Sequence, residues 1–178
     1  MVSLTFLFWM FVVLFGIIGA MRGWAKELLV AFSMILSLAF IRLLESNVPF
    51  VSDLITAQSV EAVFWMRVII VIVLVFFGYQ TVALPRFASK AAREKLQDIL
   101  LGFIFGAFNG YLVAGTLWFF MHEANYPFLT YILPPDPNTL MGQSATDLLP
   151  YLAPRLFSDF AIYLAVIMAF IFVLVVFI

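Results

Sequence analysis

The sequence predicts an all-α polytopic membrane protein, a single membrane domain over residues 1–178 with about five transmembrane helices and an interfacial amphipathic helix. Of its residues, 66% are hydrophobic and only 11% are charged, whereas a soluble domain is about half apolar and about a quarter charged. The hydrophobic residues are gathered into runs of about 20, which as helices cross about 30 Å of hydrocarbon. The 22 Phe and four Trp suit a lipid-facing surface with aromatic anchors at the interfaces.

Two spans are expected to form a hairpin at the start of the chain. The first, residues 2–21, carries no charge, and its N-terminus lacks the basic region and the cleavage site of a signal peptide. A polar hinge of about six residues, 22–27, separates it from the second span, residues 28–44. So short a hinge requires the two helices to run antiparallel and side by side.

The third expected span, residues 63–84, follows a connection over residues 45–62 that carries acidic but no basic residues. Pro49 in this connection is expected to stop the preceding helix, because a proline disfavours helical geometry in the residue before it. Arg67 lies about one turn inside the third span, where its long side chain can snorkel to the interface. A functional role for Arg67 is the less favoured alternative.

The segment of residues 85–98 is predicted to be an amphipathic helix that lies in the membrane interface. Alanine, leucine and isoleucine line one face of this helix, and charged residues line another. Its basic residues could bind anionic lipid headgroups: Arg86, Lys90, Arg93 and Lys95. The alternative, in which these charges only fix the topology, is equally supported by the pattern.

The fourth expected span, residues 99–121, contains three glycines four residues apart, Gly102, Gly106 and Gly110. On a helix they share a face with Asn109, the one strongly polar residue in mid-span. Because small residues let helices approach closely in lipid, this spacing predicts a glycine-zipper packing surface. The simpler alternative is that glycine is common in membrane helices.

Two stripes of small residues elsewhere in the chain could face these glycines. One lies on the first helix and its hinge: Gly16, Gly19, Ala20 and Gly23. The other lies on the fifth expected span, residues 160–178: Ala161, Ala165 and Ala169. Both helices run antiparallel to the fourth span in a five-span topology, so direction does not choose between them.

A proline-rich connection over residues 122–159 joins the fourth and fifth spans and contains six of the eight prolines. The proline spacing favours one or two short broken helices against the membrane surface over a folded domain. The fifth span ends within its apolar run, so either its end is flush with the interface or the chain continues beyond Ile178.

The distribution of charge predicts the orientation of the chain. Residues 22–27 and 85–98, which lie on the same side of a five-span protein, hold six of the nine Lys and Arg. Because Lys and Arg accumulate on the cytoplasmic side, the N-terminus is expected outside and the C-terminus inside.

Residues that carry chemistry are scarce. The chain has no cysteine and one histidine, His122, and it lacks the glycine-rich nucleotide motifs, the GxSxG motif and the HExxH motif. No pair of acidic residues lies in mid-span, where a proton or sodium path would need one. We therefore expect no catalytic residue, no cofactor, no metal ion and no nucleic-acid partner.

Three stretches resemble the colicin V production protein (CvpA-like) family. They are Gly19-x-x-Arg22-Gly23-x-x-Lys26-Glu27 after a membrane helix, Leu101-Gly102-Phe103-x-x-Gly106-x-x-x-Gly110 after a basic segment, and residues 144–156. The resemblance covers about residues 1–157 and implies a bacterial inner-membrane protein linked to colicin V production or export and to envelope homeostasis. No catalytic residues are established for the family. The resemblance also favours the first helix as the partner of the glycines, because the fifth span lies outside it.

Three functions are compatible with these features. A membrane scaffold or export accessory of the resembled family is favoured, with membrane lipids and other membrane proteins, or a second copy of the chain, as partners. An accessory subunit of a larger respiratory or photosynthetic membrane complex is the alternative. A small channel or transporter is less favoured, because the sequence has no convincing repeat with helices broken at mid-membrane.

Overall fold

The computed structural model describes residues 3–80, 95–128, 132–157 and 160–177, and every regular element in these ranges is helical. Four helices are long and apolar enough to cross a membrane, or up to five if the bent C-terminal pair counts as one span. The long helices are α1 (Leu4–Arg22), α2 (Trp24–Asn47), α4 (Val60–Tyr79) and α6 (Lys95–Glu123), with α9 (Phe160–Phe177) at the C-terminus. The predicted all-α membrane fold is confirmed.

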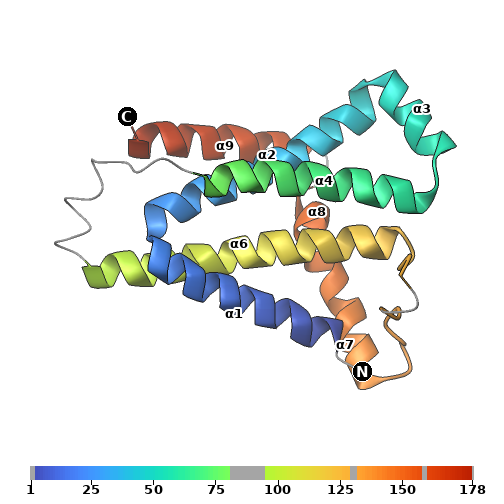
Figure 1. Ribbon diagram of the computed structural model, residues 1–178, viewed down its shortest axis with the longest axis horizontal. Coiled ribbons are helices and arrows are strands. Elements are labelled where there is room, and N and C mark those ends of the chain that lie inside the picture. The colour runs from blue at the N-terminus through green and yellow to red at the C-terminus, as the bar shows by residue number, and fades with distance from the viewer. Residues whose placement is uncertain (1–2, 81–94, 129–131, 158–159, 178) are drawn as a thin grey trace.

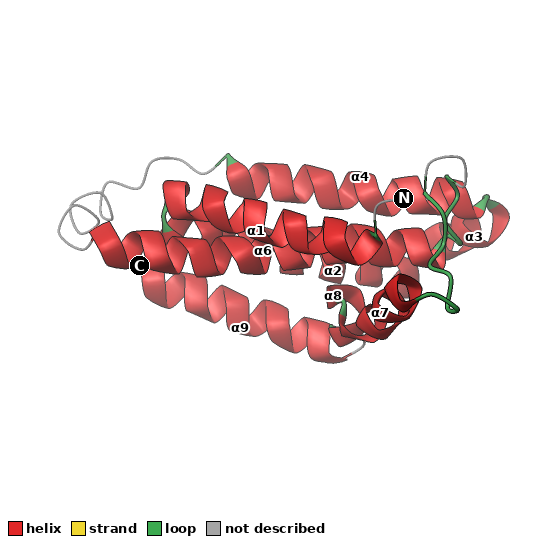
Figure 2. Cartoon of the chain, turned by 90° about the horizontal axis from the view of Figure 1, so that it is seen from below, coloured by secondary structure: helices red, strands yellow, loops and turns green. Residues whose placement is uncertain are grey.

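The long helices run back and forth along the long axis of the molecule, so that alternate connections gather at the same end (Figure 1). α1 lies along α6, and α2 contacts α4, α6 and α9. α4 and α9 lie on opposite sides of the layer that contains α1 and α6 (Figure 2). α2 and α6 are therefore the central helices, and their buried residues include Val30, Met34 and Leu112.

The predicted polar hinge over residues 22–27 is wrong. α1 ends at Arg22 and α2 begins at Trp24, so that Gly23 alone lies between them. The φ of Gly23 is 87°, in the region that favours glycine, and its N–H donates to a carbonyl oxygen of the last turn of α1 at 2.9 Å. Because one glycine makes the turn, Glu27 lies inside α2 and not in a loop.

Pro49 follows the end of one helix and begins another. α2 stops at Asn47, close to where the sequence predicts, and α3 (Pro49–Ala57) starts at the proline itself. Proline suits the first position of a helix, where its missing N–H is not needed. The connection over residues 45–62 therefore contains a short helix that the sequence analysis does not predict.

α6 begins before the predicted start of the fourth span. Residues 95–98 form its first turn, and the rest of the predicted amphipathic helix over residues 85–98 lies outside the described residues. α6 has 29 residues. At about 1.5 Å per residue it is about 44 Å long, so its ends extend beyond about 30 Å of hydrocarbon into the interfaces.

The proline-rich connection forms short helices, and its second half packs against the bundle. These helices are α7 (Leu140–Leu148), the 3-10 turn η1 (Leu149–Tyr151) and α8 (Ala153–Leu156). Leu152 and Ala153 are fully buried, and α8 contacts α6. Tyr111 of α6 donates a hydrogen bond to the carbonyl oxygen of Tyr151. The segment packs into the bundle because Gly115 of α6 leaves room for the side chain of Leu152.

The alanine stripe of α9 lies apart from the glycines of α6. α9 packs against α2, and Ile162 of α9 is buried, with an exposed fraction of 1%. Ala161 is exposed, while Ala165 and Ala169 are half-buried. α9 therefore turns most of its surface away from the bundle.

Candidate functional site

The glycines of α1 and α6 form a seam in which the two backbones touch. We define this glycine seam as Gly16, Gly19, Gly102, Gly106 and Gly110. A Cβ added to Gly19 would lie 2.7 Å from the Cα of Gly106 and would also collide with the carbonyl oxygen of Gly102. A Cβ on Gly106 would lie 2.8 Å from the Cα of Gly19. α1 is thus the neighbour of these glycines, which is the arrangement that the sequence analysis favours.

Glu27 lies fully buried in the first turn of α2, beside the glycine seam. Nη1 of Arg22 donates to its Oε1 at 2.5 Å. Nδ2 of Asn109 donates to its Oε2 at 2.8 Å and to its carbonyl oxygen at 2.9 Å. The amide faces the carboxylate with its donor side, as an ionised carboxylate requires. The N-terminal end of α2 adds a favourable helix dipole.

Arg22 extends the same site to α4. Its Nη2 donates to the carbonyl oxygen of Tyr79 at 3.2 Å, and its guanidinium carbon lies 4.2 Å from the centroid of the Tyr79 ring. A guanidinium over an aromatic face is attracted by the ring's quadrupole. Arg22 and Tyr79, which are half-buried, and Glu27 and Asn109, which are fully buried, form one polar cluster. We call it the buried polar cluster, and it joins α1, α2, α4 and α6.

Asp98 supports the turn between α1 and α2. Its Oδ1 accepts the N–H of Trp24 at 3.2 Å, at the start of α2. A carboxylate at this position satisfies a helix donor and complements the helix dipole. A Cβ on Gly23 would lie 2.8 Å from Oδ2 of Asp98, so the contact itself requires glycine at this turn. The sequence analysis misses Asp98, because its partner lies 74 residues away.

A second group of charges joins the opposite ends of α2, α4 and α6. Nε of Arg67 donates to Glu45 at 2.7 Å, and Nη1 donates to Glu123 at 2.6 Å. The guanidinium also lies 5.4 Å from the centroid of the Phe120 ring. Arg67, for which the sequence analysis favours snorkelling to the interface, thus also has two carboxylate partners at this end of the bundle.

The predicted lipid-binding residues are only partly described. Arg86, Lys90 and Arg93 lie outside the described residues, and Lys95 is exposed in the first turn of α6. Nowhere in the described ranges do three or more His, Asp or Glu side chains gather as they would around a metal ion. The arrangement that the structure does bring together, a buried ion pair with an amide donor, is chemically suited to fixing helix positions.

Comparison with known proteins identifies the family. The model of the family described as colicin V production protein matches residues 4–132. No curated protein and no solved structure matches the chain. The match contains the stretch from Gly19 to Glu27 and the glycines of α6, whereas the resemblance expected for residues 133–157 lies beyond it. Because the match extends over well more than half of the sequence, the chain belongs to the colicin V production protein family.

Proposed function

We propose that this chain is a non-enzymatic scaffold of a bacterial cytoplasmic membrane that assists export or envelope homeostasis. One observation carries the proposal: both oxygens of the buried Glu27 carboxylate accept hydrogen bonds that hold helices together. Arg22 occupies one oxygen, and Asn109 occupies the other. A carboxylate in catalysis or ion transport needs an oxygen that a substrate or an ion can reach.

The two charged groups at opposite ends of the bundle support the same role. The buried polar cluster fixes α1, α2, α4 and α6 at one end, and Arg67 with its two carboxylates fixes α2, α4 and α6 at the other. Beside the buried polar cluster, the glycine seam holds α1 against α6. A bundle held at these points has rigid outer surfaces, to which other membrane proteins or a second copy of the chain can bind.

Two measurements test the scaffold role. The chain, tagged at its native locus and extracted in mild detergent, should migrate in a stoichiometric complex with other membrane proteins. Vesicles that contain the purified chain alone should release no ions or small solutes above the rate of protein-free vesicles. A chain that migrates alone and conducts ions is a channel, and the proposal is then wrong.

An accessory role in a larger respiratory or photosynthetic complex is the second candidate. The observation that favours it is α9, which buries Ile162 against the bundle and exposes most of its other side chains. Copurification with the subunits of such a complex, lost on deletion of residues 160–178, would favour this candidate over an export accessory.

We also infer that the N-terminus faces outward and the C-terminus inward. The turn at Gly23 lies beside the first turn of α6, because Asp98 accepts the N–H of Trp24. The Lys and Arg residues that the sequence places before and within this turn favour the cytoplasmic side for this end of the bundle. A reporter fused after Glu94 should therefore be active only in the cytoplasm, and one inserted near Asn138 only outside it. The opposite result at both positions would reverse the orientation.

A further inference from the structure

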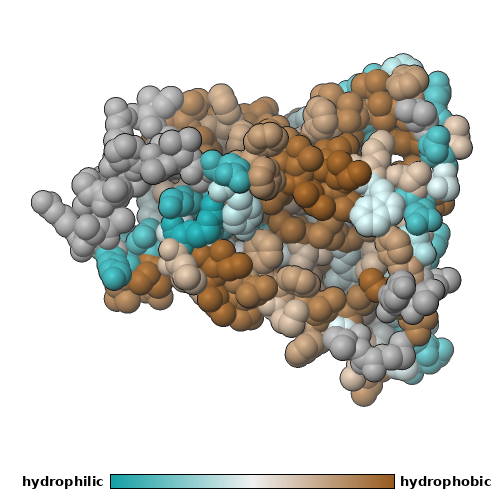
Figure 3. All heavy atoms as spheres, viewed as in Figure 1, coloured by the Kyte–Doolittle hydropathy of each residue, from teal (hydrophilic) through white to brown (hydrophobic). Residues whose placement is uncertain are grey.

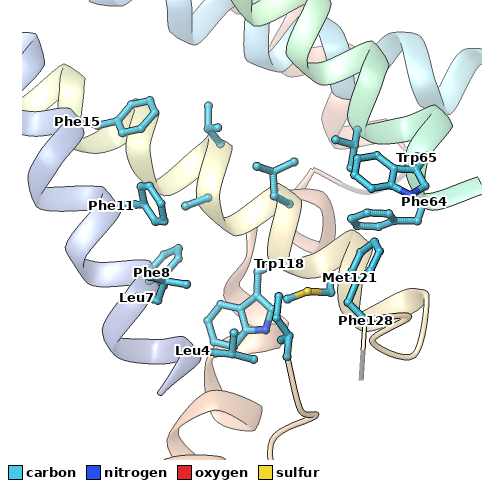
Figure 4. A pocket seen from close by; sticks show the side chains of 15 residues that line it. Leu4, Leu7, Phe8, Phe11, Phe15, Phe64, Trp65, Trp118, Met121 and Phe128 are labelled. Atoms are coloured by element: carbon cyan, nitrogen blue, oxygen red, sulfur yellow. The ribbon is translucent and has the colours of Figure 1, made fainter. Parts of the chain in front are cut away.

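An apolar groove lies between α1 and α4, with α6 as its floor (Figure 4). It encloses about 430 Å³, within the about 300–1,000 Å³ that is usual for small-ligand sites. Aromatic rings line much of it, among them Phe8, Phe11, Trp65 and Phe128. Hydrophobic residues also dominate the surrounding face of the molecule (Figure 3). The groove therefore offers a ligand hydrocarbon contacts and little else.

The groove exists because α1 and α4 touch at one end and diverge towards the other. At the closed end, the rings of Phe15 and Tyr79 meet edge to face with centroids 6.5 Å apart. Towards the N-terminus of α1 the two helices separate (Figure 1). Ala114 of α6, with its small side chain, is part of the lining between them. The result is a wedge-shaped space along the direction in which lipid chains lie.

Aromatic residues line the wide end of the groove. The ring of Phe128 packs against Phe64 at 5.6 Å and against Trp65 at 5.7 Å between centroids. Nε1 of Trp118 donates to the hydroxyl of Tyr126 at 3.4 Å, so its polar atom already has a partner. The lining at this end therefore offers apolar contacts that suit a hydrocarbon chain.

A second cavity of about 420 Å³ adjoins this end of the groove. Leu4 lines both cavities, and Ile132 of the groove precedes Leu133 of the second cavity. The lining of the second cavity includes hydroxyl groups and the carboxylate-bearing Asp136, and it contains no Lys or Arg. Oδ1 of Asp136 accepts two hydrogen bonds, both from Asn138. The exposed carboxylate of Asp136 gives this lining a negative charge, which suits a cationic or hydroxylated group.

We propose that the two cavities together form a binding site for one membrane lipid with an amine-bearing headgroup. An acyl chain occupies the groove, and the ammonium group lies near Asp136. The negative charge of Asp136, without a basic residue in the lining, disfavours an anionic headgroup. This binding site does not depend on the scaffold role.

Native mass spectrometry of the purified full-length chain tests the lipid site. The chain in mild detergent is titrated with phosphatidylethanolamine or phosphatidylglycerol that carry the same acyl chains. We expect one phosphatidylethanolamine to bind per chain, several-fold more tightly than phosphatidylglycerol. Asp136→Asn should remove this preference and leave binding of the acyl chain. Equal binding of the two lipids to the unmodified chain overturns the proposal. Detection of a dimer of the chain without bound lipid overturns it as well.

Filling the groove provides the second arm of the test. Ala114→Phe should weaken phosphatidylethanolamine binding by about tenfold for every two methylene groups that it excludes. Ala165→Phe on α9, outside the groove, is the matched control and should bind as the unmodified chain does. Leu117→Trp fills the same groove and replaces Ala114→Phe if that variant does not fold. Unchanged lipid binding in a folded groove-filling variant overturns the proposal.

Discussion

Replacing Gly106 with alanine will destabilise the bundle by about 3 kcal/mol, at the upper end of what overpacking usually causes. The new Cβ would lie 2.8 Å from the Cα of Gly19 and would press on the carbonyl oxygen of Phe15. Both neighbours are backbone atoms, so no rotamer change relieves the clash, and α1 must move away from α6. Unfolding of the purified chain, followed by circular dichroism in mild detergent, measures the loss.

Gly115→Ala is the matched control on the same helix. Its Cβ would lie 3.3 Å from Cδ2 of Leu152, the far end of a flexible side chain, and 3.4 Å from the ring of Phe8. A small shift of the leucine accommodates the methyl group, so the expected loss is below about 1 kcal/mol. If Gly106→Ala and Gly115→Ala reduce stability equally, backbone contact in the glycine seam is not what holds α1 to α6.

Glu27→Gln will reduce stability by about 3 kcal/mol, because it removes the counterion of a partly buried guanidinium. The side chain of Arg22 is 20% exposed, and that of Glu27 is 0% exposed. Water therefore cannot enter at position 27 to replace the carboxylate that the guanidinium of Arg22 loses. Glu61→Gln in the exposed first turn of α4 changes the same functional group in solvent. It should change stability by less than about 0.5 kcal/mol.

A double variant tests whether the cluster acts as one unit. Asn109→Leu alone removes the amide donor from the carboxylate of Glu27 and also destabilises the bundle. Residues within one hydrogen-bonded network are coupled, so the double variant with Glu27→Gln should lose less stability than the two single losses together. Losses that simply add would show that the two side chains contribute independently.

The parts of the fold that depend on local composition are predictable from the sequence. Each long helix follows from a long, mainly apolar run, because hydrocarbon forces the backbone to satisfy its hydrogen bonds within one segment. The four-residue spacing of Gly102, Gly106 and Gly110 likewise predicts a packing face without knowledge of its neighbour. The helix that lies against that face is a question of three-dimensional arrangement, and spacing alone left two candidates.

The buried polar cluster is the part of the structure that local sequence patterns do not predict. Lys26 and Glu27 after Gly23 have the composition of a polar hinge, and the sequence analysis assigns them to one. Glu27 is instead helical and buried, with Arg22 as its counterion and a hydrogen bond from Asn109, which lies 82 residues away. No sequence window contains both residues. The helix that begins at Pro49 is also not predicted, since a proline that stops one helix is also suited to begin the next.

The Arg22–Glu27 pair also determines how this chain can enter the membrane during its synthesis. Glu27 and Asn109 are 82 residues apart. At about 5–20 residues per second, the ribosome completes Asn109 about 4–16 s after Glu27. Arg22 is only five residues from Glu27 and belongs to the same hairpin, so the carboxylate meets its counterion as soon as α1 and α2 come together. The hairpin thus carries its own neutralising charge into the lipid, and the amide of α6 completes the site when that helix arrives.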